Sequence, residues 1–319
     1  MTAPATAHPE TLTPDAADDG ARAAARSAPP TRRADLFSLA KPRITFMVAL
    51  TTAVGFLLAS PRPLDWLALL HALIGTALVA GGASALNQVV EQHIDARMQR
   101  TARRPLPSGR LSRELGLAFG VALSIVGMAY LAIWVNLTTA VLGALTLAGY
   151  VFVYTPMKRV SSLSTIVGAV PGAVPPMMGV TAVTGRVDAL AWALFGILFV
   201  WQMPHFLAIA WMYRSDYARG GFPMLTVLDE GGDQTARQML LWAAALLPVS
   251  LLPSVLGVSG LPYLLGAVVL SSVFLGYAWA FTRGYSRQAA RRVLLVSVLY
   301  LPVMLILLLV DRVIWGAGS

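Results

Sequence analysis

Long runs of apolar residues, separated by short polar segments, fill the chain from about residue 43 onwards. Segments 44–60 and 294–310 contain no charged residue, and each approaches the roughly 20 residues that a helix needs to cross a bilayer. The runs predict nine spans, at about residues 43–60, 66–90, 114–134, 138–154, 163–182, 188–212, 238–256, 262–282 and 293–312. We therefore predict an all-α fold, a polytopic bundle of nine transmembrane helices.

Prolines interrupt two of these predicted spans. Pro171, Pro175 and Pro176 fall in the fifth span and predict a kinked helix, and Pro204 does the same near the end of the sixth. Transmembrane helices tolerate proline where neighbouring groups satisfy the freed backbone atoms.

The composition agrees with a membrane protein. The chain is 57% hydrophobic and 12% charged, and a soluble protein would carry about twice that charged fraction. It contains no cysteine, which excludes a disulfide framework, a thiolate metal site and a cysteine nucleophile.

Residues 1–34 differ from the rest of the chain. They are rich in Ala, Pro, Thr and Asp and have no apolar periodicity, so we interpret them as a disordered cytoplasmic tail. The tail lacks the apolar core of a signal peptide. Its Arg and Ala content is similar to that of a mitochondrial transit peptide, but Asp15, Asp18 and Asp19 argue against that function. Residues 35–319 are then one transmembrane domain.

The basic residues indicate the topology. If the N-terminus is cytoplasmic, all but three of the 24 Lys and Arg residues lie inside, the exceptions being Arg62, Arg186 and Arg312. This predicts a bacterial inner-membrane protein with a cytoplasmic N-terminus and a periplasmic C-terminus. The net charge of +9 is therefore a topology signal, with some residues available for an anionic substrate, and it does not indicate nucleic-acid binding.

Three oxygen-bearing side chains, Asn87, Glu91 and Asp95, recur at four-residue intervals where the second span reaches the cytoplasmic side. On a helix they share one face, about 6 Å apart. Two carboxylates on one face repel each other unless a cation lies between them, and Mg²⁺ prefers oxygen ligands that it shares with substrate phosphates. We call this set the acidic ladder and interpret it as a metal site; the alternative is an ordinary solvated helix end.

A basic stretch follows the acidic ladder directly. Arg97, Arg100, Arg103 and Arg104 precede a loop, 105–109, that contains two prolines and a glycine. Arginine binds phosphate oxygens in a bidentate manner, and such a loop is stiff and turned. Topology alone explains the number of arginines but not their position beside the ladder. Together, ladder and arginines predict a binding site for a metal–diphosphate.

The end of the fourth span offers further candidates. Tyr154, Lys158 and Arg159 lie on the cytoplasmic side, where Lys158 is expected to neutralise a leaving diphosphate. The alternative is a snorkelling anchor with an interfacial tyrosine.

Two residues in and after the sixth span complete the candidates. His205 is an ionisable group inside an apolar span, which makes it either a functional residue or a hydrogen-bonded packing residue. Asp216 either completes the metal site or pairs with Arg214 or Arg219. His71, far from these groups, is expected to pack between helices.

The sequence around these residues resembles the intramembrane UbiA-type prenyltransferases, which attach isoprenoid groups to acceptors, and most closely the members whose acceptor is haem. The matching segments are 41–43, 87–107, 154–159, 171–176 and 201–225, and the resemblance spans about residues 36–315.

The resemblance implies a nine-helix bundle around a central cavity open to the cytoplasmic side, with Mg²⁺ held by two acidic motifs. Relatives usually carry two aspartates four residues apart in the second motif. Here Asp216 matches the later one while Met212 occupies the earlier position, and Glu91 stands where many relatives have Asp. The number of bound metal ions therefore stays open.

For the haem-accepting members, the resemblance implies farnesyl transfer from farnesyl diphosphate to a vinyl group of protohaem IX (haem B), with addition of water, giving haem O and diphosphate. The implied catalytic residues are Asn87, Glu91, Asp95 and Lys158, and the implied metal ligands are Asn87, Glu91, Asp95 and Asp216. The implied substrate-binding residues are Arg43, Arg97, Arg103, Arg104, Tyr154, Arg159, His205 and Arg214. His205 is expected to contact the haem iron or a propionate, and a haem A synthase or a terminal oxidase is the implied partner.

Two other functions remain open from the sequence. The same chemistry on another acceptor, such as a quinone precursor or chlorophyllide, is disfavoured by segments 154–159 and 201–206. A transporter or non-catalytic haem-handling protein would commonly show internal repeats and polar groups at mid-membrane, whereas the charges here gather on one face.

Overall fold

The computed structural model describes residues 31–315 and the side chains of residues 31–313. Most of the predicted tail, residues 1–30, lies outside the described residues. Its last residues belong to a short helix, α2 (Arg32–Leu39), which Thr31 caps by accepting a hydrogen bond from the Ala34 amide.

Within the described residues, nine helical spans are long and apolar enough to cross a membrane, which confirms the predicted all-α architecture. The spans are α3 (Pro42–Ala59), α4 (Trp66–Asp95), α5 (Arg113–Trp134), α6 with its extension (Leu137–Met157), α8 (Ser164–Thr184), α9 (Ala189–Met212), α12 with α13 (Asp233–Val255), α14 (Leu261–Phe281) and α15 (Arg287–Trp315). The protein is therefore a multi-pass membrane protein.

Several helices extend beyond the apolar runs that predicted them. Helix α4 continues five residues past the predicted end, to Asp95, and α15 begins at Arg287, six residues before the predicted start. Hydropathy falls where charges begin, but the helical hydrogen bonds continue into the polar turn. Helix starts carry ordinary caps: Asp65, Ser112 and Asp188 each accept a hydrogen bond from an amide three residues later.

The fourth span changes its winding near its cytoplasmic end. Helix α6 (Leu137–Ala148) passes into a π-helical turn, η1 (Gly149–Tyr154), and then into α7 (Thr155–Met157). Such turns occur often at functional sites. Helix α8, by contrast, runs as one helix through Pro171, Pro175 and Pro176.

Close helix packing holds the centre of the bundle together. A Cβ atom on Gly55 of α3 would lie 2.0 Å from the carbonyl oxygen of Pro176, and one on Gly179 of α8 would lie 2.0 Å from that of Thr52. Only glycine at these two positions allows α3 and α8 to approach so closely.

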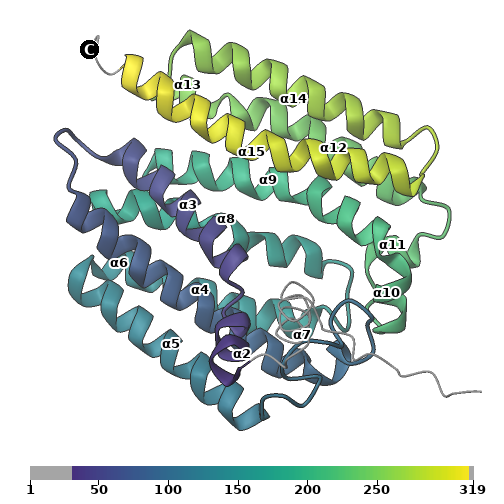
Figure 1. Ribbon diagram of the computed structural model, residues 1–319. Helices are drawn as coiled ribbons and strands as arrows, with labels where there is room; N and C mark the ends of the chain where they lie inside the picture. Colours follow the sequence, from purple (N-terminus) through teal and green to yellow (C-terminus); the bar gives the residue numbers. More distant parts are fainter. Residues whose placement is uncertain (1–30, 316–319) are drawn as a thin grey trace, which may run out of the picture.

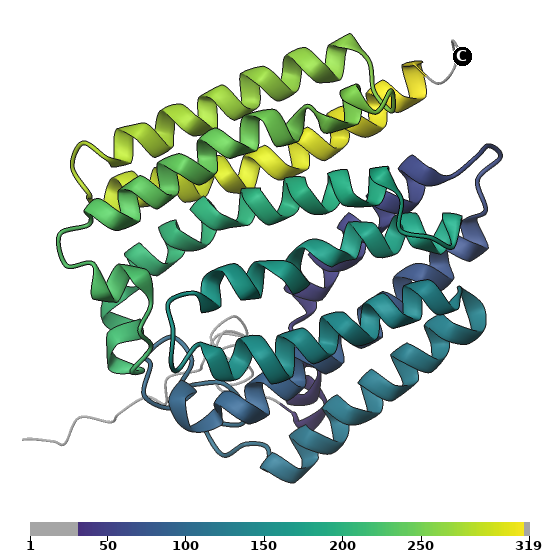
Figure 2. The ribbon, with the colours of Figure 1, turned by 180° about the vertical axis from the view of Figure 1, so that it is seen from behind.

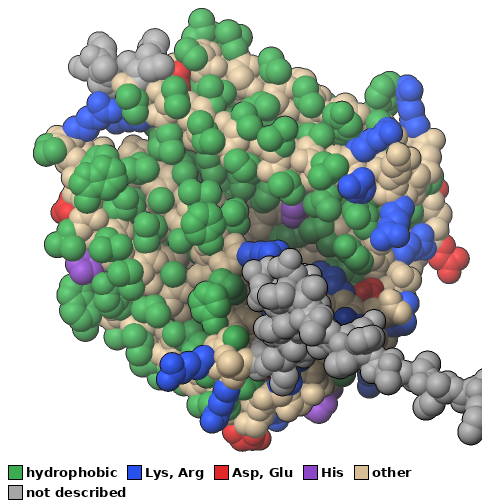
Figure 3. Space-filling view, viewed as in Figure 1, with side chains coloured by type: hydrophobic (Ala, Val, Ile, Leu, Met, Phe, Trp, Pro, Cys, Tyr) green, Lys and Arg blue, Asp and Glu red, His purple; other side chains and the backbone are tan. Residues whose placement is uncertain are grey.

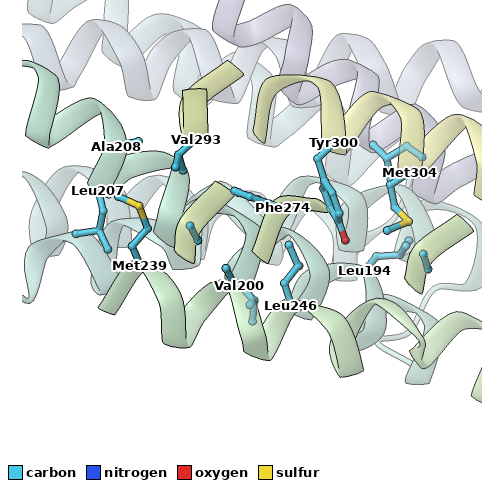
Figure 4. Packing of buried hydrophobic residues seen from close by; sticks show 14 of the residues in the cluster. Leu194, Val200, Leu207, Ala208, Met239, Leu246, Phe274, Val293, Tyr300 and Met304 are labelled. Carbon is cyan, nitrogen blue, oxygen red and sulfur yellow. The ribbon is translucent and has the colours of Figure 1, made fainter. Parts of the chain in front are cut away.

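The second half of the bundle has its own core. Helix α9 packs against α12 and α15, and α14 packs against α12 and α15. Figure 4 shows side chains from these helices, among them Met239, Phe274, Tyr300 and Met304, filling the space between them. Tyr300 is fully buried but satisfied, because its hydroxyl lies 2.7 Å from Ser250 Oγ.

The outer surface is apolar. Ile133, Leu137 and Phe152 expose 69%, 71% and 71% of their surface, as expected for side chains that face lipid. Figure 3 shows hydrophobic side chains over most of one face, with Lys and Arg side chains beside a hollow in it.

The irregular polar segments gather at one end of the bundle. Figure 1 shows α2, α7, α10 (Arg214–Arg219) and α11 (Leu225–Leu228) at this end, and Figure 2 shows the same grouping from behind. The acidic ladder ends in the same region, because Asp95 is the last residue of α4.

Candidate functional site

The acidic ladder lies on the buried face of α4. Asn87, Glu91 and Asp95 expose only 1%, 4% and 1% of their surface. The solvated helix end considered as an alternative is therefore wrong. Buried carboxylates require compensating positive charge, and each member of the ladder has a basic neighbour from another part of the chain.

Glu91 pairs with Lys158. The Lys158 ammonium donates to Glu91 Oε1 at 2.9 Å and lies 4.6 Å from the centre of the Tyr154 ring. Burial opposes the charge of Lys158, but the neighbouring Tyr154 and Glu91 outweigh it and raise the pKa of Lys158. The π-helical turn and α7 thus bring Lys158 against Glu91 and the Tyr154 ring beside Lys158.

Asn87 contacts a residue that the sequence did not single out. Lys41, just before α3, donates to Asn87 Oδ1 at 3.3 Å, while Asn87 Nδ2 donates to Thr155 Oγ1 at 3.1 Å. Burial, with the positive charges of Arg104 and Lys158, lowers the pKa of Lys41 to about 7.

Arg43, which the sequence suggested instead of Lys41, is exposed. Pro42 begins the helix, and Lys41 before it takes a left-handed backbone with φ 47° that directs the chain towards α4. In segment 41–43 it is therefore Lys41, and not Arg43, that contacts the ladder.

Asp95 pairs with Arg104 from the loop after α4. Arg104 Nη1 lies 2.6 Å from Asp95 Oδ2, while Asp95 Oδ1 is buried and has no hydrogen-bond partner in the described part of the chain. A buried carboxylate oxygen without a donor is costly and marks a position for a further donor or a cation. Thr101 Oγ1 donates to the Asp95 carbonyl oxygen and holds the loop at the helix end.

Asp216 contacts the same loop at Gln99. Helix α10 places its Oδ1 3.2 Å from the backbone amide of Gln99, and its carboxylate also pairs with Arg219. Although burial raises the pKa of Asp216, the hydrogen bonds from Arg219 and from the backbone amides of Gln99 and Arg100, together with the charge of Arg219, outweigh it and lower the pKa below the ordinary value. Arg219 is the predicted partner that Asp216 takes, since Arg214 lies over the Trp211 ring at 4.8 Å.

The donor set suits a hard cation. Asn87, Glu91, Asp95 and Asp216 offer oxygen atoms, and Asp95 Oδ1 has no other partner. No group of three or more His, Cys, Asp or Glu side chains within residues 31–313 is close enough to form a metal site by itself. The structure therefore does not gather the four predicted ligands into one cluster, since Asp216 lies against Gln99 and Arg219. A Mg²⁺ ion at the ladder would take its remaining ligands from phosphate and water.

The remaining predicted arginines contribute unequally. Arg97 and Arg103 are exposed. Arg159 donates to the Val90 carbonyl oxygen at 2.9 Å and so supports α4. Arg100 lies over the rings of Tyr213 and Tyr217, at 5.4 and 5.8 Å, in a polar cleft of about 720 Å³ that Arg214, Arg219 and Arg287 also line.

An apolar cavity of about 570 Å³ lies beside the ladder. Its wall on α4 includes Ala83 and Ser84, one turn before Asn87, so one face of α4 joins the cavity to the ladder. Tyr150 and Tyr154 line it from η1. The lining residues come from α3, α4, α6, η1, α8, α9 and α15, and several on α3 and α15, such as Met47 and Val298, are also exposed. The cavity therefore opens towards the lipid-facing surface.

The two histidines that the sequence weighed have different surroundings. His205 lines the apolar cavity, and its Nδ1 lies 2.8 Å from Ser297 Oγ. His71 Nδ1 lies 2.8 Å from the Tyr130 hydroxyl, and its ring stacks on Trp134. The predicted packing role of His71 is confirmed.

Nine spans within residues 31–315, a buried polar cluster and an apolar cavity are the arrangement expected of an intramembrane prenyltransferase. The chain belongs to the UbiA prenyltransferase family, whose sequence model matches residues 48–307. The chain is 50% identical over 289 residues to "Protoheme IX farnesyltransferase" of Solibacter usitatus (strain Ellin6076), covering 87% of this chain and 98% of that protein. It is 49% identical to the protein of the same name from Salinibacter ruber (strain DSM 13855 / M31), again over 87% and 98% of the two chains.

Solved structures have the same fold. A digeranylgeranylglyceryl phosphate synthase superposes with a TM-score of 0.74 at 15% sequence identity, over 87% of this chain and 97% of that one. A UbiA homolog from Archaeoglobus fulgidus bound to GPP and Mg²⁺ superposes with a TM-score of 0.58 at 14% identity, over 86% and 99%.

Proposed function

We propose that the protein transfers the farnesyl group of farnesyl diphosphate to a vinyl group of haem B, with addition of water, and releases haem O and diphosphate. The observation that carries this proposal is that one face of α4 bears Ala83 and Ser84 in the wall of the apolar cavity and, from Asn87 one turn further on, the buried ladder with its cations. The names of the relatives point to haem as acceptor.

The ladder provides the diphosphate end of the site. Asn87, Glu91, Asp95 and Asp216 would hold Mg²⁺, and a neighbour of the same fold is bound to GPP and Mg²⁺. When bound, Mg²⁺ neutralises the diphosphate and makes it a better leaving group. Asp95 Oδ1 is the oxygen in this set with no competing partner within the described residues.

Basic side chains of the protein would also stabilise the negative charge of the diphosphate. Lys158 and Arg104 already lie beside the ladder and, with Lys41 when it is protonated, would stabilise the negative charge that develops as the bond between C1 and the diphosphate oxygen breaks. The resulting allylic cation is attacked by the vinyl carbon of the acceptor. Water then adds to the new cation and loses a proton, which gives the hydroxyl group of haem O.

The cavity provides the apolar end. Its aliphatic and aromatic lining would exclude water from the allylic cation and suits the hydrophobic parts of both substrates. The transporter alternative fits less well, because the charged groups of the site lie at one end of the bundle (Figure 1).

The orientation follows from the same grouping. We propose a bacterial inner-membrane location with the ladder and the N-terminus on the cytoplasmic side, where most basic residues lie. Since haem O is hydrophobic and stays in the bilayer, a membrane-bound haem A synthase or terminal oxidase is its proposed recipient.

Purified protein in detergent, mixed with farnesyl diphosphate, haem B and Mg²⁺, should form haem O and diphosphate, detected by mass spectrometry and a diphosphate assay. Parallel reactions with 4-hydroxybenzoate, a quinone precursor, should give no prenylated product. Prenylation of that acceptor and not of haem would overturn the assignment of the acceptor, and the absence of diphosphate release with either would overturn the transferase function.

A further inference from the structure

His205 is the ionisable side chain of α9 that faces the apolar cavity. It lies within a membrane span and lines the cavity together with Trp201 and Gln202. Burying an imidazole among apolar side chains costs free energy, because they offer its nitrogens no hydrogen-bond partners. An ionisable group at such a position is a candidate for a functional role.

The hydrogen bonds around Ser297 favour one tautomer of this imidazole. Ser297 Oγ donates its hydrogen to the Leu294 carbonyl oxygen at 2.7 Å. Since a hydroxyl has one hydrogen, Oγ acts as the acceptor in its 2.8 Å contact with His205 Nδ1. This arrangement favours the neutral tautomer with its proton on Nδ1 and a lone pair on Nε2.

Trp201 fixes the plane of the ring. Its indole stacks on the imidazole, with ring centres 5.0 Å apart and planes 27° from parallel. Its Nε1 donates to the Ser297 carbonyl oxygen at 2.8 Å. Trp201 and His205 of α9 are thus both hydrogen-bonded to Ser297 of α15, which leaves the imidazole ring little freedom to rotate.

No residue within 31–313 hydrogen-bonds Nε2 of His205. A neutral imidazole whose Nδ1–H is held by an acceptor, with a bare Nε2 at an apolar cavity, has the arrangement of a metal-binding histidine and its supporting partner. Resting on the proposed function, which supplies haem as acceptor, we propose that His205 Nε2 is an axial ligand of the haem iron and that Ser297 is its positioning residue.

This ligation would serve the reaction by orientation. An iron–nitrogen bond fixes the centre of the macrocycle on α9, so the haem vinyl groups are held at a set distance from α4, where the ladder holds the diphosphate. Fixing an acceptor against a reactive carbon can supply a large part of the rate enhancement.

The test uses the full chain in detergent with ferrous haem B and no isoprenoid. Resonance Raman spectroscopy should show an iron–histidine stretching band, which His205→Ala abolishes and added imidazole restores. Metal-free protoporphyrin IX should bind to wild type and His205→Ala equally, because it offers no iron. His71→Ala, which alters the histidine packed on Tyr130, is the matched control and should keep the band.

The positioning role of Ser297 is tested by a measurement that a general loss of stability would not change. Ser297→Ala should shift the iron–histidine band and weaken haem binding by about tenfold, and Ser297→Thr, which keeps the hydroxyl, should restore both. An unchanged band in His205→Ala would overturn the ligand assignment, even if haem is farnesylated. A His205-dependent band without haem O formation would instead overturn the proposed reaction and leave the ligand assignment standing.

Discussion

Lys158 and Glu91 join the ends of two membrane spans through an ion pair of 2.9 Å, across 67 residues of sequence. Both side chains are largely buried, at 18% and 5% exposure, and the Tyr154 ring covers the ammonium from the side of the cavity. The Lys158 ammonium is therefore held between the apolar cavity and the ladder before any substrate binds.

Removal of this cation should affect stability and turnover separately. Lys158→Met leaves Glu91 buried without its partner, which costs about 3–5 kcal/mol of unfolding free energy. It also removes a charge placed at the leaving diphosphate, so turnover should fall by about 10²–10³-fold. Thermal unfolding in detergent and haem O formation measure the two effects.

The double variant Lys158→Met/Glu91→Gln separates the effect on stability from the effect on turnover. It removes both charges and should recover most of the lost stability but little of the activity. Arg113→Ala, at an exposed position on α5, should change neither. Recovery of full turnover in the double variant would show that Lys158 has only a structural role.

Asp95 should be required for metal use more than for folding. Its Oδ1 has no partner within the described residues, and Asp95→Asn keeps the shape of the side chain while weakening an oxygen ligand. We expect membrane insertion to be normal, turnover to fall by at least about 100-fold, and the Mg²⁺ concentration for half-maximal rate to rise. Asp95→Ala should abolish turnover.

His93→Ala serves as the control on the same turn of α4, because His93 is exposed there. Its activity should match that of wild type. If Asp95→Ala still forms haem O at the normal rate, the ladder is not the metal site.

Lys41 should matter more than Arg43. Lys41 contacts Asn87 and stands beside the other cations of the site, whereas Arg43 is exposed on the first turn of α3. Lys41→Ala should therefore lower the rate of farnesyl transfer by about tenfold or more, and Arg43→Ala should lower it less. Steady-state kinetics with varied concentrations of farnesyl diphosphate show which variant loses more activity. A larger loss of rate with Arg43→Ala would contradict the contact of Lys41 with the ladder.

The sequence was sufficient for the spans because a bilayer demands long apolar helices, and hydropathy reports this demand directly. It was sufficient for the ladder too, since four-residue spacing on a helix fixes one face. The basic residue that pairs with the ladder was harder to predict from the sequence. Arg104 pairs with Asp95 while the adjacent Arg103 is exposed, and no periodicity in the 96–112 loop distinguishes them.

Local conformation explains the other differences. Lys41 reaches the ladder through a left-handed backbone before Pro42, and Tyr154 reaches Lys158 through a π-helical turn. Neither conformation leaves a pattern in the order of apolar and polar residues. The pairing of His205 with Ser297 joins α9 to α15, and such contacts between distant helices depend on packing that a single sequence does not display.

The approach of α3 to α8 yields a prediction about stability with a matched control. A Cβ on Gly179 would lie 2.0 Å from the Thr52 carbonyl oxygen, so Gly179→Ala forces two helices apart and should cost about 1–3 kcal/mol of unfolding free energy. Because both helices also line the cavity, haem O formation should fall with it. Gly276→Ala on α14 meets no atom within 4 Å and should be neutral or stabilise the helix by up to about 1 kcal/mol. Thermal unfolding in detergent compares the two, and equal stability of both variants would mean that α3 and α8 are not in close contact in the membrane-extracted protein.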